Sequence, residues 1–353
     1  MPLMDELARV ARLIEEAKRR VLEISRPIEP ESGWRTLGAV VAHSLVEWRA
    51  GVIVVVAKTV PLLLERGGRA KRVGPVRSTA YLGLSSFRPE ERGAFMSTVT
   101  SALAASQLLQ LAEPDALFIC QTSVTFPPEV GVRERPPVNV LKVCRELMGI
   151  LNPTRPQEVA YKGAELAAGE LASTYGLKLS QPLSAYLGEY CAMAAALARL
   201  EATARETGVP LAWLSKCSRS LSRRLKLEAW VTDEALLSFA WEEVDRAALC
   251  LAEVVDDEWA RQLTGLTPLL AMRRVWYYKL GPAGGIGRMA RSGSPSEGWY
   301  LLGVLASAAD RRGRLRALER GALLAAVRRE ELESAWSQVR RAFSSSPLRL
   351  LLS

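Results

Sequence analysis

The stretch GAVVAHSLVEW, residues 38–48, decides the fold, because its apolar run is typical of a buried β-strand that ends near polar residues. Two more strand-like runs follow, VIVVVAKTV at 52–60 and VRSTAYLGL at about 76–84. Gly51 and the basic stretch at 66–72 supply the turns between these runs. Three consecutive strands joined by short turns predict an antiparallel meander.

Beyond the meander, helices and strands alternate along the chain. Pro89, Glu90 and Glu91 favour the start of a helix that ends near Ala112, because proline suits the first turn and acidic residues suit the positive end of the helix dipole. Further strands are expected at 116–120, 211–215, 250–255 and 273–280. Further helices are expected at about 138–150, 156–175, 183–207, 233–240, 297–310 and 314–343.

This order predicts an α/β protein of the RNase H-like class. We expect a mixed sheet, built from an antiparallel meander followed by βα units and flanked by helices, with a helical insertion at about 138–207. Residues 1–34 are predicted to form an N-terminal helix and linker, 35–320 the main domain, and 321–353 a C-terminal helix and an apolar tail.

The composition and net charge of the chain limit the functions that it can have. The 353 residues are 49% hydrophobic and 24% charged, as in soluble globular proteins. The net charge of +9 favours a polyanionic partner, above all nucleic acid, although a generally basic, solvated surface would give the same excess. Residues 1–25 show helical charge spacing rather than a signal peptide, and no apolar run reaches the roughly 20 residues that cross a bilayer. We therefore expect a cytoplasmic protein with no membrane partner.

The cysteine and asparagine content limits further the kind of protein and the sites that it can contain. The five cysteines form no CxxC pair, which argues against zinc and redox sites and favours reduced, buried thiols. Asn139 and Asn152 are the only asparagines, while charged residues are abundant. This bias indicates a thermophilic source, although GC-rich codon usage would also enrich Arg and Ala.

Several segments over about 35–320 resemble, in the right order, the NurA family of archaeal and bacterial DNA-end nucleases, which work with the hexameric ATPase HerA. LAWLSKCSRS, from residue 211, resembles the family's Ser-Lys-Ser-like motif through Ser215 and Lys216. RVWYYKL at 274–280 resembles its late aromatic strand, and GWYLLGVLASAAD at 298–310 resembles its C-terminal helix. The resemblance implies the RNase H-like fold and a DNA-processing role.

The same resemblance implies that the family's metal ligands are replaced here. Ala42 and His43 stand where the family has an Asp-Gly turn, Gln121 where it has a second Asp-Gly, and Ser307 about where it has a histidine. The segment 92–103 carries no counterpart of the family's helical Glu. Mg²⁺ and Mn²⁺ prefer carboxylates, and two-metal hydrolysis needs several of them. We therefore expect no catalytic residue, metal or cofactor, and Mn or Mg only if the ligands are rearranged.

Basic residues follow the strand at 211–215, beside the expected cleft, where they could contact phosphates of any sequence. The predicted DNA-binding residues are Ser215, Lys216, Arg219, Arg223, Arg224 and Lys226. A solvated basic helix face is the alternative explanation. Nearby aromatic residues could stack on bases, but core or interface positions explain them better. These are Trp213, Trp230, Trp276, Tyr277 and Tyr278.

Other chemistries find little support. His43 is the only histidine and lies in no nucleophile elbow, which argues against Ser-His-Asp or Cys-His catalysis. GPAGGIGRMA at 281–290 is interpreted as a flexible turn rather than a dinucleotide-binding turn, because RSGSPSEG follows in place of a helix.

Three hypotheses for the function remain open. The first is a non-catalytic NurA-like subunit in DNA-end processing and repair, which binds DNA, docks on a HerA-like ATPase, pairs with an active NurA paralogue, or forms a homodimer. The second is an active nuclease that draws its ligands from Glu47, Asp115, Asp233 or Asp310. The third is a structural interaction protein without DNA affinity.

Overall fold

The computed structural model describes residues 2–49, 51–67, 69–84, 88–123, 126, 137–152, 154–175, 181–215, 220–227, 231–255 and 258–342. Its strands are β1 (Thr36–Arg49), β2 (Val52–Glu65), β3 (Arg69–Arg72), β4 (Arg77–Leu84), β5 (Ala116–Gln121), β6 (Leu211–Ser215), β7 (Ala247–Val254), β8 (Met272–Lys279) and β9 (Gly287–Arg291). Its helices are α1 (Pro2–Ile24), α2 (Pro89–Ala112), α3 (Val140–Met148), α4 (Pro156–Tyr175), α5 (Gln181–Thr207), α6 (Ser220–Arg224), α7 (Asp233–Ala240), α8 (Glu258–Gln262), α9 (Pro268–Ala271), α10 (Pro295–Ala308), α11 (Arg316–Ala325) and α12 (Arg329–Ala342).

One mixed sheet joins these strands. β1 pairs antiparallel with β2 and parallel with β5, and β5 pairs parallel with β6. From β6 the sheet continues through β9, β8 and β7 in antiparallel pairs. The order across the sheet is β3-β2-β1-β5-β6-β9-β8-β7, with β4 also paired to β2. The predicted mixed sheet, a meander followed by βα units, is confirmed.

β2 is long enough to pair with two strands along one edge. Its residues 52–59 pair with β4, whereas its residues 62–65 pair with β3. Pro61 lies between these two segments, where the outer partner changes, and a proline has no N–H to give to a ladder. Its carbonyl still accepts a hydrogen bond from the amide of Val73 at 3.1 Å.

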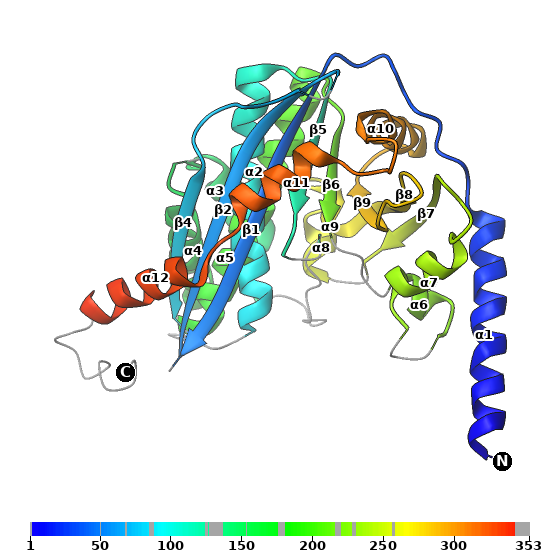
Figure 1. Ribbon diagram of the computed structural model, residues 1–353. Helices are drawn as coiled ribbons and strands as arrows, with labels where there is room; N and C mark the ends of the chain where they lie inside the picture. Colours follow the sequence, from blue (N-terminus) through cyan, green and yellow to red (C-terminus); the bar gives the residue numbers. More distant parts are fainter. Residues whose placement is uncertain are drawn as a thin grey trace.

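Helices cover both faces of the sheet (Figure 1). The larger core lies between the sheet and α2 to α5, and it includes Val40 and Phe95. A second core lies between the sheet and α10 to α11, and it includes Val41 and Leu301. Val40 and Val41 enter different cores because successive residues of a strand point to opposite faces. The strand that opened the sequence argument is therefore buried on both sides.

Three helices, α3, α4 and α5, form the predicted insertion between β5 and β6. α4 and α5 approach closely at Gly163 and Gly188, where a side chain on either glycine would collide with the backbone of the other helix. A fully buried ion pair joins α5 to α2: Arg92 donates to Glu189 from Nε at 2.7 Å and from Nη2 at 2.6 Å. The hydroxyl of Tyr81 also donates to Glu189.

Three local predictions are wrong. Residues 69–72, expected as a turn, form β3, and residues 287–290 of the expected flexible turn at 281–290 belong to β9. β9 exists because β6 and β8 supply hydrogen bonds on both of its edges. The helix expected at 314–343 is two helices, because Ala326 has the extended angles φ −54° and ψ 119° between α11 and α12. Gly285 and Gly287 lead into a strand rather than a helix, which agrees with the argument against a dinucleotide turn.

The division of the chain into three parts remains a prediction, and its boundary at 320–321 falls within α11. The apolar tail that ends the chain lies outside the described residues.

Cys120, Cys144, Cys191 and Cys250 are free thiols, as expected, and burial raises the pKa of Cys120 to about 12. Over the ranges given above, none of the helices combines the length and apolar character needed to cross a membrane.

Candidate functional site

Four side chains lie in a row across the sheet where β1, β5, β6 and β9 run side by side. Ala42 pairs with Gln121, Gln121 with Ser215, and Ser215 with Arg288. Directly paired residues project to the same face, and neighbouring strands are about 4.8 Å apart, so the four residues form one line about 14 Å long. We call these four residues the cross-strand row. It contains two of the predicted metal-site positions, Ala42 and Gln121.

Gln121 and Ala42 fill their positions with neutral groups. Gln121 is 2% exposed, and its Nε2 donates to the hydroxyl of Thr98 at 3.2 Å. Thr98 belongs to α2, the helix on which the resemblance implies a glutamate. The Oε1 of Gln121 has no hydrogen-bond partner among the described residues. Ala42 offers only a methyl group, and its carbonyl accepts from the amide and hydroxyl of Thr122, both at 3.0 Å.

Arg288 places a permanent positive charge at the other end of the row. Its side chain is 2% exposed. Its Nη1 donates to the carbonyl of Phe126 and, at 3.2 Å, to the hydroxyl of Ser215. Its Nη2 lies 3.6 Å from Glu253, a carboxylate that also accepts from Nε of Arg273 at 3.0 Å. An arginine keeps its charge in proteins, so this position opposes a divalent cation, and Glu253 already supplies its anionic partner.

His43 lies on the opposite face of β1 from the row, because it is the next residue after Ala42. Its Nδ1 accepts a hydrogen bond at 3.2 Å from the amide of Val327, in the link between α11 and α12. The following residue, Ser44, bonds Ser123 through its amide at 2.9 Å. His43, predicted to occupy a former metal-site position, therefore makes a structural contact that holds the C-terminal helices.

Ser307 is not brought to the cross-strand row. Its hydroxyl accepts from Nε1 of Trp34 at 2.6 Å and donates to the carbonyl of Val304 at 2.8 Å. Trp34 precedes the start of β1, and the six residue steps from Thr36 to Ala42 span about 20 Å of strand. Ser307 therefore lies near the opposite end of β1 from the other predicted metal-site positions.

Comparisons with known proteins agree with the fold described above. No protein-family model matches the chain, and no curated protein matches it. Among solved structures, the NurA nuclease from Sulfolobus solfataricus aligns with a TM-score of 0.58 and 13% identity, over 97% of this chain and 95% of that one. A second NurA structure aligns with a TM-score of 0.62 and 11% identity, over 100% and 99%. NurA bound to dAMP and manganese aligns with a TM-score of 0.59 and 12% identity, over 96% and 94%. This chain has the NurA fold.

Within the NurA fold, the predicted DNA-binding residues follow the carboxyl end of β6. Ser215 ends that strand as part of the row, and Arg223 and Arg224 are exposed on α6. Lys226 is also exposed, and its backbone adopts a left-handed φ of 57°. Arg224 donates to the carbonyl of Ala252 at 2.9 Å. Lys216 and Arg219 lie outside the described residues.

The aromatic residues take the core positions predicted for them. Trp213, Trp276, Tyr277 and Tyr278 are buried, and Trp213 stacks on Phe126 with ring centroids 3.8 Å apart. Trp230 lies outside the described residues. The described aromatic residues near the row therefore support the sheet from within rather than forming an exposed platform for bases.

Gln121 and Ser215 also line an open cavity of about 720 Å³ beside α11. Its walls are largely apolar and come from the sheet, from the β8–β9 connection and from α11. The charged residues that line it are Glu234, Arg314 and Glu319. The cavity lies on the opposite face of the sheet from the side chains of the row, with Val41, Cys120 and Leu214 in its wall, and it adds no concentrated positive charge.

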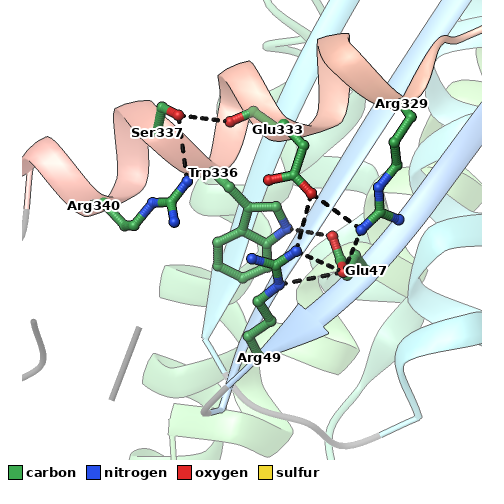
Figure 2. A network of polar contacts seen from close by, with 7 residues as sticks. All are labelled: Glu47, Arg49, Arg329, Glu333, Trp336, Ser337 and Arg340. Carbon is green, nitrogen blue, oxygen red and sulfur yellow. Dashed lines mark hydrogen bonds and ion pairs between the residues drawn. The ribbon is translucent and has the colours of Figure 1, made fainter. Parts of the chain in front are cut away.

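The first carboxylate available for rearranged metal ligands, Glu47, holds α12 on β1 (Figure 2). Its Oε1 accepts from Nη2 of Arg49 at 2.9 Å and from Arg329 at 3.1 Å, and its Oε2 accepts from Nε1 of Trp336 at 2.8 Å. Glu333 of α12 receives the same two arginines at 3.1 Å each. These donors hold the pKa of Glu47 below its usual range, although burial opposes them.

The other three carboxylates lie apart from Glu47 and from one another. Asp115 accepts from the amides of Arg35 and Thr36 before β1. Asp233 is fully buried and accepts from the hydroxyls of Ser222 and Tyr277. Asp310 organises the turn before α11 through the amides of residues 312 and 314 and the guanidinium of residue 316. Over the described ranges, no three His, Cys, Asp or Glu side chains converge as a metal site would require.

Sequence reasoning missed Arg288, which contributes most to the electrostatics of the row. It stands in a glycine-rich segment that was interpreted as a turn, and strand pairing alone aligns it with Ser215. The segment shows no regular alternation of apolar and polar residues, because Ile286 and Ala290 share a face with Arg288 while Gly287 and Met289 share the other.

Proposed function

We propose that this NurA-fold chain is a non-catalytic, cytoplasmic subunit in DNA-end processing and repair. It binds DNA through the basic segment after β6, and it docks on a HerA-like ATPase or pairs with an active NurA paralogue or a second copy of itself. Arg288 is the observation that supports this proposal most strongly. A guanidinium in line with Ala42 and Gln121 opposes the binding of two dications there.

The comparison structures support the DNA-related part of the proposal. One NurA structure contains manganese and another contains dAMP and manganese, so proteins of this fold bind nucleotide and metal. In this chain the positions that the resemblance assigns to metal carry a methyl group and an amide. We infer that the nucleic-acid function was kept while the metal-dependent chemistry was lost, in a protein of a thermophilic source.

Incubation of the full chain with single- and double-stranded DNA and Mn²⁺ tests the loss of catalysis. We expect no cleavage above the level of a heat-inactivated sample. Cleavage that a Glu47→Ala/Asp115→Ala variant loses would support the active nuclease with rearranged ligands instead, since both residues belong to that set. Cleavage by wild type that this variant keeps would also contradict the proposal.

Fluorescence anisotropy with labelled DNA across salt concentrations tests the binding. We expect Arg223→Glu/Arg224→Glu to weaken binding at least about tenfold and to reduce the slope of log K against log salt by about 2, because each phosphate contact contributes about 1. Lys71→Glu/Arg72→Glu on exposed β3 carries the same charge change and serves as the matched control. Equal losses in both variants would indicate a general charge effect, and no DNA affinity in wild type would leave the structural interaction protein.

A further inference from the structure

A second cavity of about 720 Å³ lies at the opposite end of β6 from the cross-strand row. The end of α5, the start of β6, α9 and the beginning of α10 enclose it. Its volume is in the range of small-molecule pockets. Neither the predicted DNA-binding residues nor the predicted metal-site positions line it.

Glu201 brings a buried carboxyl group to this cavity. The residue is 8% exposed, and its Oε1 accepts from the hydroxyl of Ser292 at 3.1 Å. The hydroxyl of Thr267 and the backbone of Leu269 are further hydrogen-bond donors to this carboxyl group. Burial raises the pKa of Glu201 to about 7, against the weaker opposing effect of Thr267 and other neighbours. Near neutral pH this carboxyl can therefore either donate or accept a hydrogen bond.

Arg291 brings a guanidinium to the same cavity. Its side chain is 8% exposed, its Nη2 pairs with Glu297, and its Nε donates to the carbonyl of Ser292 at 2.9 Å. Its Nη1 has no partner in the described structure. Trp213 also lines the cavity, and its buried Nε1 lacks a partner as well. A cavity of this size with apolar walls and a few converging polar side chains, here Glu201, Arg291 and Ser292, has the composition of a small-molecule site.

The charges around the cavity nearly cancel. Arg205 and Arg291 face Glu201 and Glu297, so the lining does not select a polyanion. The remaining walls are mostly apolar and include Pro210, Trp213 and Leu269. A fitting ligand is therefore uncharged overall and partly apolar, with hydrogen-bond donors and acceptors next to each other on one edge.

We propose that this cavity binds a nucleobase, with the base edge on Glu201 and Arg291 and the ring against the apolar walls. A nucleobase combines an uncharged aromatic ring with adjacent donors and acceptors. The base belongs either to a free nucleoside or to a nucleotide of a DNA strand. The inference goes beyond the proposed function and does not depend on the basic segment after β6.

Titration of the full chain with each of the four 2′-deoxynucleosides, followed by calorimetry or ligand-observed NMR, tests the pocket. We expect at least one deoxynucleoside to bind with a Kd below about 1 mM. Glu201→Gln, which changes the donor and acceptor pattern at the same volume, should weaken binding at least about tenfold. Glu206→Gln, an exposed position on the same helix, is the matched control and should bind like wild type.

Further variants keep the test decisive. Ala204→Leu fills the cavity from the wall of α5 and should also abolish binding, and thermal unfolding checks that each variant is folded. Binding of 2-deoxyribose 5-phosphate as tight as that of the nucleosides would overturn the proposal, since it lacks a base. Saturation by no deoxynucleoside, or unchanged affinity in folded Glu201→Gln and Ala204→Leu, would also overturn it.

Two comparisons assign the source of the base and separate this inference from the proposed function. Displacement of the deoxynucleoside by a single-stranded oligonucleotide would support the pocket and assign its base to DNA, whereas nucleoside binding without displacement supports a free nucleoside. Arg223→Glu/Arg224→Glu should bind deoxynucleosides like wild type, so failure of DNA binding and failure of the pocket are distinguishable.

Discussion

Arg288 and Arg291 lie three residues apart on β9, and both are buried, yet they occupy different electrostatic surroundings. Arg288 directs its Nη1 and Nη2 to groups of the protein: the carbonyl of Phe126, the hydroxyl of Ser215 and the carboxylate of Glu253. Arg291 pairs with Glu297, which is 57% exposed, and leaves its Nη1 beside a cavity. Among the described residues each guanidinium keeps one nitrogen without a partner, Nε of Arg288 and Nη1 of Arg291, so the exposure of the carboxylate partner, 14% for Glu253 and 57% for Glu297, is what distinguishes the two charges.

The largest expected change in the free energy of unfolding distinguishes Arg288 from Arg291. We expect Arg288→Met to lower the free energy of unfolding by about 3 kcal/mol, because it leaves buried acceptors without their donor. Arg291→Met should cost about 1 kcal/mol, because its partner Glu297 keeps contact with water. Urea unfolding at pH 7 measures both values. Equal losses, or a larger loss for Arg291→Met, would contradict the distinction.

Glu201 gives the next largest effect, through pH. Its folded-state pKa is raised from 4.5 to about 7, so the folded protein holds the proton more tightly than the unfolded chain. This contribution is fully present below pH 4.5 and is lost as pH rises to about 7. Relative to Glu201→Gln, wild type should lose about 3 kcal/mol of unfolding free energy between pH 5 and pH 8. Parallel stability curves for the two proteins would show that the carboxyl is not perturbed.

Glu47 should give the smallest change in the free energy of unfolding, and its pH dependence should have the opposite sign to that of Glu201. Its pKa is lowered, so its stabilising contacts with Arg49, Arg329 and Trp336 are present above pH 4.5 and weaken as pH falls through the folded-state value. We expect Glu47→Gln to cost about 1 kcal/mol at pH 7, because the pairs are partly exposed. The difference from wild type should narrow as the solution is made more acidic. A difference that grows towards low pH would contradict the network in Figure 2.

Much of the fold was predictable because burial leaves a periodic signal. The apolar runs of β1, β2, β5 and β6 identified the centre of the sheet, and Pro89 marked the start of α2. β9 gave almost no signal, since only Met289 and Ala290 in it are apolar and it is held by strands on both sides. The break before α12 depends on contacts from elsewhere in the chain, including the bond from Val327 to His43.

The candidate site was predictable only in part, for a related reason. Ala42 and Gln121 could be identified because each ends an apolar run at a strand position that the NurA resemblance assigns to metal. Their alignment with Arg288, and the distance of Ser307 from them, depend on strand order, which one-dimensional spacing does not contain. The cavity at Glu201 combines residues from five elements, α5, β6, α9, β9 and α10, so no local sequence pattern predicts it.

A titration with Mn²⁺, followed by the electron paramagnetic resonance signal of the free ion, tests the central claim most directly. The cross-strand row holds a methyl group, an amide, a hydroxyl and a guanidinium. We predict that the full chain shows no saturable Mn²⁺ site with a Kd below about 1 mM, with or without DNA. Saturable, tighter binding of Mn²⁺ that Gln121→Ala abolishes would show that this edge of the sheet is still a metal site, and would contradict the account.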